Sequence, residues 1–375
     1  MAAPYGINVN CSIGSALATG LRGALRSAIG EVDEATGEWR PHKTDPTELD
    51  QTLEPHARGS ILVAAVFDAF LQIYDHRTAD LYRLATGGTG ILRPGAIHPD
   101  LVARLSEEAA KCAQHTLTMC IRALDYCPPV DITFGEFLRA IITADRDLVP
   151  DDDLRYRVSF IEAFRRRGIY PRGLRTLSEE SLTWRSPQND EMHPSAKLEG
   201  ALERLRSYAH EYLYSRGGSE MIHSRERLFH LERKMRRDIH GWMKEHFGSG
   251  RDGRDDARFL GVDPDLAFEV HTARFAMRMA PDGGVDPQII LSLLQEAIVP
   301  VDSERPDGPT VPFEGGSTMI ADLLDCNFRY CIRKNLSSDA RRKRQQEFAE
   351  FQMEFPRATY FGRAREPFAA LHRGL

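Results

Sequence analysis

The stretch EPHARGSILVAAVFDAFLQIY (residues 54–74) decides the expected fold class, because it contains the longest nearly apolar run of the chain. From Gly59 to Tyr74, apolar side chains surround almost the whole circumference of a helix. This pattern is typical of a helix buried on all sides. The longest nearly apolar run is Ile61 to Leu71, and only Asp68 interrupts it. We therefore expect a helix here that is the most deeply buried element of the protein.

The segments on both sides of this stretch also have helical patterns. Leucines recur every four residues between Leu17 and Leu25, which makes one helix face apolar. Pro99 suits the first position of a helix, and Thr133 with Glu136 forms a capping-box pattern. Helices are predicted over residues 13–29, 59–74, 99–127, 133–144 and 151–167.

The charge pattern changes after residue 186. Residues 197–247 are charged, rich in arginine and helical in period. The basic residues around 225–237 lie among acidic ones, and such mixed signs at helical spacing usually mark a solvated face. Residues 248–253 have the glycine content of a linker.

The last part of the chain favours a sheet. From residue 261 apolar and polar residues begin to alternate, and turn signals stand at residues 281–284 and 324–327. Residues 289–299 fit a strand or a helix equally well. A small antiparallel sheet closed by a charged helix over residues 337–351 is expected.

Together these patterns predict a mainly α fold in three parts. A helical domain covers residues 1–186, and a charged helix with a linker covers 187–260. A smaller α+β domain, with an antiparallel sheet and a C-terminal helix, covers 261–375. Two domains or more are the ordinary expectation for a chain of 375 residues.

Composition limits the class of protein and its surroundings. The formal charge of −6 excludes a globally basic nucleic-acid binder but not a local basic patch. Nucleic acid is not the expected partner, although a contact through the arginine-rich residues 225–237 stays open as an alternative. The first residues lack the basic start and apolar core of a secretory signal, and the apolar run is shorter than the ~20 residues that span a bilayer. The six cysteines include no CxxC pair. We expect a cytoplasmic protein with reduced thiols and no membrane contact.

Short catalytic motifs are absent from the sequence. A metallopeptidase HExxH motif would place two histidines on one helix face beside a glutamate. His210 and Glu211 begin such a motif, but Tyr214 stands where the second histidine is needed. No GxSxG motif and no Walker A loop occurs, and the glycines of residues 87–90 fit a plain loop.

Three segments together resemble the fungalysin and thermolysin families of zinc metallopeptidases, which are gluzincins. The first is residues 54–68, where a His-Ala-x-Gly type of stretch opens an apolar helix. The second is FGEFLRAIITAD (residues 134–145), and the third is AFRRRGI (residues 163–169). Their order and spacing are similar to those at the C-terminal end of fungalysins. The resemblance covers about residues 10–170.

This resemblance implies a role for His56. In these peptidases the helical C-terminal lobe supplies a histidine that donates a hydrogen bond to the oxyanion of the tetrahedral intermediate. A donor aimed at developing negative charge acts mainly in the transition state. His56 matches that histidine, and Asp50 is the nearest upstream candidate for the aspartate that orients it, although its spacing differs from the family's.

The same resemblance implies that part of the catalytic machinery is missing from this chain. HExxH and the third zinc ligand belong to the N-terminal lobe of the family, and neither is present here. The complete family member would hold zinc and hydrolyse peptide bonds, whereas this chain alone is expected to bind no cofactor and to be inactive. Its expected partner is the missing lobe, or a second copy of itself.

Two alternatives stay open at this stage. His56 also fits a loop residue or a neighbour of a helix N-cap beside Pro55. The whole chain also fits a non-catalytic helical scaffold or a protein-interaction module. Asp68 raises a separate question, because a carboxylate in an apolar helix needs a partner. The candidate partners are Arg58, Arg77 and Arg139.

Overall fold

The computed structural model describes residues 30–32, 39–52, 55–92, 95–187, 193–214, 225–279 and 285–354. The chain divides into two compact units. Unit 1 comprises Met1–Leu124 and Phe134–Thr183, and unit 2 comprises Asp125–Thr133 and Trp184–Leu375. The helix predicted over residues 13–29 lies outside the described residues.

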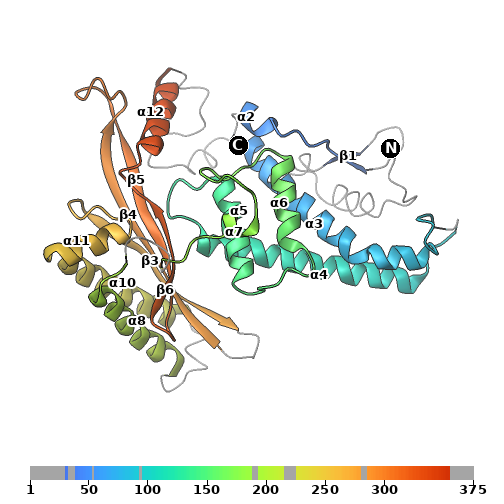
Figure 1. Cartoon of the computed structure of the whole chain (residues 1–375), viewed down its shortest axis with the longest axis horizontal. Helices are drawn as coiled ribbons and strands as arrows, with labels where there is room; N and C mark the ends of the chain where they lie inside the picture. The colour runs from blue at the N-terminus through green and yellow to red at the C-terminus, as the bar shows by residue number, and fades with distance from the viewer. Residues whose placement is uncertain are drawn as a thin grey trace. The chain divides into compact units, whose positions relative to one another are not determined.

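Unit 1 is a set of packed helices (Figure 1). The long helix α3 packs against α4 and α6, and α5 packs against α4 and α6. Two short strands pair ahead of the helices, with Glu31 opposite Arg40. The elements are β1 (Gly30–Val32), β2 (Trp39–Pro41), α2 (Glu48–Gln51), α3 (Pro55–Ala85), α4 (Pro99–Ala123), α5 (Phe134–Arg146), α6 (Tyr156–Arg166) and α7 (Glu179–Leu182).

The capping residues explain where two of these helices begin. His98 precedes Pro99, and its Nδ1 accepts a hydrogen bond from the backbone N–H of Asp100 at 3.2 Å. The carboxylate of Asp152 accepts the backbone N–H groups of Tyr156 and Arg157 at 2.7 and 2.9 Å. These acceptors satisfy N–H groups that have no partner inside the helix, so α4 and α6 start at defined residues.

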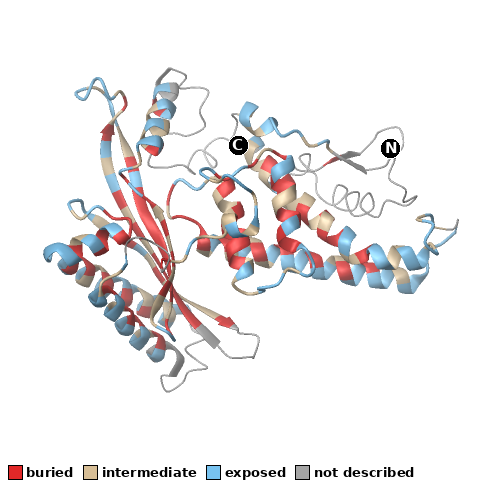
Figure 2. Cartoon of the chain, in the orientation of Figure 1, coloured by how far each residue is buried: buried red, intermediate tan, exposed pale blue. Residues whose placement is uncertain are grey.

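Helix α3 is buried on one side only. Its innermost residues include Ala64, Ala65 and Ala69, which are at most 1% exposed. Small side chains let the neighbouring helices approach closely, whereas Val63 on the same helix is 43% exposed. Ile73 and Tyr74 are equally buried, so the buried side of α3 holds both small and large residues. The expected burial on all sides is wrong, because exposed residues lie along the other side of the helix (Figure 2).

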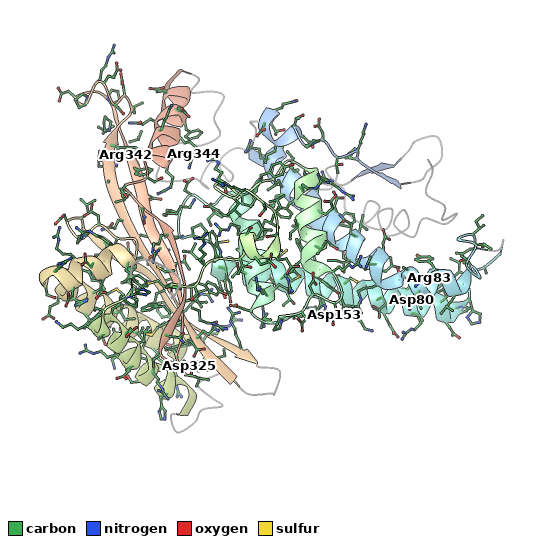
Figure 3. The ribbon with its side chains drawn as sticks, viewed as in Figure 1. Asp80, Arg83, Asp153, Asp325, Arg342 and Arg344 are labelled. Atoms are coloured by element: carbon green, nitrogen blue, oxygen red, sulfur yellow. The ribbon has the colours of Figure 1, made fainter. Side chains whose placement is uncertain are left out.

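Unit 2 is built on a four-stranded antiparallel sheet of order β3-β4-β5-β6, in which each strand pairs with the next along the chain. The turn between β5 and β6 contains Asp325 (Figure 3) and Cys326, whose φ is +51°. The hairpin expected at residues 324–327 is confirmed. The strands are β3 (Phe268–Met279), β4 (Val285–Pro300), β5 (Thr310–Asp322) and β6 (Asn327–Lys334).

Helices cover one face of this sheet. Apolar residues of α8, α10 and α11 form one core with Ile289, Leu291 and Met319 of the strands. Helix α10 packs on β3 and also contacts α8 and α11, as Figure 1 shows. The helices are α8 (Ala196–Tyr214), α10 (Arg225–Phe247), α11 (Gly250–Phe259) and α12 (Asp339–Glu354), of which α12 contacts β5.

The segment Asp125–Thr133 contacts side chains from the other face of the sheet. The short 3₁₀ turn η2 (Leu124–Tyr126) places the Tyr126 ring 5.6 Å from the ring of Tyr330. A β-bulge separates Phe328 from Tyr330, since Phe328 pairs with Ala321 and Tyr330 pairs with the neighbouring Ile320. The two rings therefore point to opposite faces of the sheet, and Phe328 belongs to the core on the helix-covered face. The buried Lys334 donates to the backbone carbonyl of Asp131 at 3.0 Å. This segment therefore belongs to unit 2, although its sequence neighbours belong to unit 1.

The prediction of a mainly α fold is wrong, because the protein is an α+β mixture. Ten α-helices and six strands lie in the described ranges. The α+β unit is not the smaller part either, since it takes more than half of the chain. The charged helices pack their apolar stripes on the sheet instead of standing apart from it, and the expected linker at residues 248–253 contains the start of helix α11.

One helix of the described part, Ala57–Ala85, is long and apolar enough to cross a membrane by length and composition. The apolar run expected to be too short for a bilayer therefore belongs to a longer helix. Of its most apolar window, 39% is buried inside the protein. A cytoplasmic location stays a prediction.

Candidate functional site

The two residues singled out from the sequence lie on consecutive helices. Asp50 is exposed on the short helix α2. His56 is the second residue of α3, so it belongs to the first helical turn and not to a loop. The side chain of His56 is outside the described part, and a pairing of His56 with Asp50 stays a prediction.

Arg58 ties the two helices together. Its guanidinium Nη1 donates to the backbone carbonyls of Leu49 and Thr52, at 2.8 and 2.7 Å. Leu49 lies in α2, and Thr52 directly follows that helix. Because Arg58 belongs to the first turns of α3, its side chain fixes the end of α2 beside the turn that carries His56.

The third resembling segment, residues 163–169, contacts α3 and the residues before α2. Arg167 directly follows α6 and binds the Asp68 carboxylate of α3, with its Nε and Nη2 at 2.8 and 2.7 Å from Oδ2. Gly168 lies against the residues before α2: a Cβ at this position would be 1.9 Å from the carbonyl oxygen of Pro46. The φ of Gly168 is +69°, so glycine is required both for its conformation and for this close approach.

The second motif segment is anchored by one buried arginine. Arg157 is 2% exposed, and its guanidinium binds Asp145 Oδ2 at 2.8 Å and Glu179 Oε2 at 2.6 Å. It also donates to the carbonyls of Val149 and Pro150. Burial raises the pKa of the Asp145 carboxyl, while Arg157 opposes that rise. The polar residues around Arg157 therefore hold the helices together.

The first residues of that segment also contact the residues after the third. A Cβ at Gly135 would lie 2.6 Å from Cα of Pro171 and 2.7 Å from the carbonyl oxygen of Tyr170. Of the three segments that carry the family resemblance, the first and the third are joined directly by the pair Asp68–Arg167. Gly135 of the second segment contacts Pro171, which follows the third, and Arg58 and Gly168 contact the residues in and before α2.

The expected partners of Asp68 are wrong, because all three candidate arginines are used elsewhere. Arg58 binds the carbonyls beside α2. Arg77 pairs with Glu108 of α4 at 2.6 Å, and Arg139 donates to the carbonyl of Leu182 at 3.0 Å. The true partner, Arg167, is 99 residues away in the sequence. No short-range pattern points to it.

The described residues do not fit a zinc ion. Among them, no group of three His, Cys, Asp or Glu side chains is arranged to hold a metal. A catalytic zinc site needs about three protein ligands and an open position. The zinc implied by the family resemblance therefore finds no ligand set in the described part of unit 1 or of unit 2.

Unit 2 contains a serine, an aspartate and a histidine in contact, but their arrangement differs from that of a catalytic triad. Asp256 is 1% exposed, and its Oδ2 is 2.6 Å from His246 Nε2. The same carboxylate accepts the hydroxyl and the backbone N–H of Ser195, and the Ser195 hydroxyl in turn accepts the N–H of Leu198 at the start of α8. In a catalytic triad the histidine lies between serine and aspartate. Here the aspartate is central, so the cluster joins α8, α10 and α11.

Unit 1 has a pocket of about 590 Å³ between α4, α6 and the loop that follows α5. Asp153, labelled in Figure 3, lies on its lining with Tyr156 and His115. His115 Nδ1 is 3.2 Å from the Tyr156 hydroxyl. Behind it, the Cys112 thiol is fully buried beside the same hydroxyl.

This pocket does not contain an activated nucleophile. Burial raises the pKa of the Cys112 thiol and raises the pKa of Tyr156 to about 12. Both groups therefore keep their protons at neutral pH, whereas thiol catalysis needs a lowered thiol pKa. Sequence reasoning missed this cluster. Its only sequence signal is the spacing of three between Cys112 and His115, which is too common to be specific.

The polar residues of both units are thus largely engaged in contacts that hold helices and strands together. No family model, no curated protein and no solved structure matches this chain.

Proposed function

We propose that unit 1 is the helical lobe of a thermolysin- or fungalysin-like zinc metallopeptidase, and that this chain hydrolyses no peptide bond by itself. One observation supports the proposal above the others: the largely buried pair Asp68–Arg167 joins the first resembling segment to the third, and the second segment lies against the residues that follow the third.

In this proposal His56 is the residue that touches the reacting atoms. Its position in the first turn of α3 is held by Arg58, which joins that turn to α2. A donor whose position is fixed before the reaction stabilises an oxyanion with little reorganisation, and the proposal assigns this role to His56. The lobe that carries HExxH has to come from outside the residues of this chain.

A second candidate function is a non-catalytic scaffold or protein-interaction module. Three apolar side chains stand exposed at one end of α4: Leu117 is 53% exposed, Ile121 is 56% and Leu124 is 64%. Their spacing of four and three residues places them on one helix face. A contiguous exposed apolar face of this kind favours contact with another protein or with a second copy.

The first experiment measures zinc content and casein hydrolysis of the purified chain. We expect neither stoichiometric zinc nor EDTA-sensitive proteolysis. The second experiment isolates the native protein from its source and searches by mass spectrometry for a polypeptide, linked or associated, that contains HExxH. Zinc-dependent proteolysis by the chain alone would overturn the proposal, and an isolated native protein without such a polypeptide would favour the scaffold.

The third experiment tests His56 in the complete, active protein. His56→Ala should lower kcat by ~10²–10³ with a small change in KM, the usual effect of losing one oxyanion donor. His76→Ala is the matched control, because His76 is an exposed histidine on the same helix. Equal activity of the two variants would remove His56 from the catalytic role.

A further inference from the structure

Unit 2 has a crevice that the proposed peptidase function does not use. It lies between α8 and α10, which run side by side on the same face of the sheet (Figure 1). Its volume is about 400 Å³, within the range of small-molecule sites. Every residue that lines it belongs to unit 2.

The floor of the crevice is apolar. Leu202 and Leu205 of α8 face Met243 of α10, and Leu291 of β4 and Phe328 of β6 come from the sheet below. All five are at most 5% exposed. Ala201, a small residue, lines the α8 side, so no large side chain fills the space at that position.

The rim of the crevice is basic. Arg204 of α8 and Lys234 of α10 lie on opposite sides and are both exposed. The ammonium of Lys234 lies 5.5 Å from the centre of the Tyr208 ring, which holds it over the opening. Asp238 is the one acidic residue of the lining, and it accepts a hydrogen bond from the Tyr208 hydroxyl.

Trp242 completes the wall. Its ring is stacked on that of His246 at 4.8 Å with an angle of 18°. His246 is fixed in turn by Asp256. A rigid aromatic face therefore borders the apolar floor, and the floor lies below two cations.

We propose that this crevice binds a small, single-chain amphiphile with an anionic head, such as a free medium-chain carboxylate. The apolar chain occupies the floor between Leu202, Leu291 and Phe328. The anionic head meets Arg204 and Lys234 at the rim. Charge complementarity selects this occupant over a neutral or a cationic amphiphile of the same length.

The test compares three probes with the same ten-carbon chain: decanoate, decan-1-ol and decyltrimethylammonium. Calorimetry with the full chain, below the micellar concentration of each probe, gives the three dissociation constants. Trp242 fluorescence reports occupancy independently, with Trp242→Phe to identify the signal. We expect decanoate to bind at least about tenfold more tightly than the cation, as two exposed charge contacts allow.

Two variants separate the charged rim from the apolar floor. Arg204→Gln with Lys234→Gln should weaken decanoate about tenfold and leave decanol within about twofold. Arg206→Gln with Arg237→Gln is the matched control, because both arginines are exposed on the same two helices and outside the crevice lining. Ala201→Trp should fill the crevice and abolish binding of both probes. Ala201→Leu replaces it if the tryptophan variant does not fold.

Three results would overturn the proposal. They are no binding of decanoate, equal binding of the cation and the anion, and binding that Ala201→Trp or Ala201→Leu leaves unchanged in a folded protein. None of these results bears on the peptidase proposal, which concerns unit 1 alone.

Discussion

Asp68 and Arg167 form a largely buried ion pair that joins α3 to the end of α6 across 99 residues of sequence. The Arg167 side chain is 3% exposed and that of Asp68 is 17% exposed. Burial raises the pKa of Asp68 more than Arg167 lowers it. The pair thus fixes the position of two motif segments, although it costs desolvation energy to bury.

Arg167→Met should lower the free energy of unfolding by about 3 kcal/mol, because it leaves the Asp68 carboxylate buried without its partner. Arg166→Met is the matched control. Arg166 pairs with Glu162 at 2.8 Å, but it is 50% exposed, so its loss should cost less than ~1 kcal/mol. Urea denaturation at pH 7 measures the free energy of unfolding of both variants. Equal decreases would mean that the buried Asp68–Arg167 pair contributes no more to stability than the exposed Arg166–Glu162 pair.

The pH dependence of stability should have opposite signs at Asp68 and Glu162. Burial raises the pKa of Asp68 above its ordinary 3.8, so the folded state binds the proton more tightly. Wild type should therefore gain stability relative to Asp68→Asn as the pH falls from 7 toward 4. Hydrogen bonds from Arg165 and Arg166 lower the pKa of Glu162 from 4.5 to about 2.

Relative to Glu162→Gln, wild type should therefore lose stability as the pH falls from about 4.5 toward 2. Urea denaturation of the three proteins over this range tests both signs. A stability difference between wild type and Asp68→Asn that shrinks with falling pH would show that pairing, and not burial, dominates at Asp68.

Two glycines of unit 1 should respond to alanine in opposite directions. Gly168→Ala should destabilise the protein by more than ~2 kcal/mol, because its φ is +69° and the added carbon would meet the Pro46 carbonyl. Gly59 lies inside α3 with open space around it, so Gly59→Ala should stabilise the protein by ~0.5–1 kcal/mol. Thermal unfolding measures both, and a tolerated Gly168→Ala would contradict the close contact with Pro46.

Arg58→Met should loosen α2 without unfolding unit 1. The variant loses two hydrogen bonds to the carbonyls of Leu49 and Thr52, while the buried side of α3 stays intact. Amide exchange should accelerate over residues 48–52 and stay unchanged in α5. Arg83→Met serves as the control on the same helix, because Arg83 is exposed at its far end (Figure 3).

Ser195 should behave as a helix cap and not as a nucleophile. Ser195→Ala should cost ~1 kcal/mol of stability, the usual value for an N-cap, and a fluorophosphonate probe should not label the wild-type protein. Asp256→Ala should cost more, because the buried His246 and the start of α8 both lose their acceptor. Labelling at Ser195 would contradict the structural role.

The sequence predicts the local elements of this fold better than their packing. Pro99 predicts the start of α4, and the capping pattern at Thr133 predicts the start of α5. The turn residues predict the hairpin turn at residues 324–327. The sequence of residues 289–299 does not distinguish a strand from a helix, because neither face of β4 is uniformly polar. Both Ile289 and Ile290 are buried, which removes the alternation that identifies a strand.

The sequence does not predict which residues pair over long distances along the chain, and the reason is physical. The position of Asp68 in an apolar helix indicates a buried charge, but any arginine that the fold brings near can neutralise that charge. The glycine content of residues 248–253 predicts a linker, whereas Gly253 permits close contact: a Cβ there would lie 1.9 Å from the His246 carbonyl oxygen. A glycine needed for flexibility and one needed for space are identical in a single sequence.

The route of the chain has a consequence for how the protein can be divided. The polypeptide passes between the two units three times, at residues 124–125, 133–134 and 183–184. A single break after residue 183 would take Tyr126 and Asp131 away from Tyr330 and Lys334, which they contact in unit 2. No single cleavage of the polypeptide can therefore release unit 2 whole, because residues 125–133 stay attached to unit 1 on both sides.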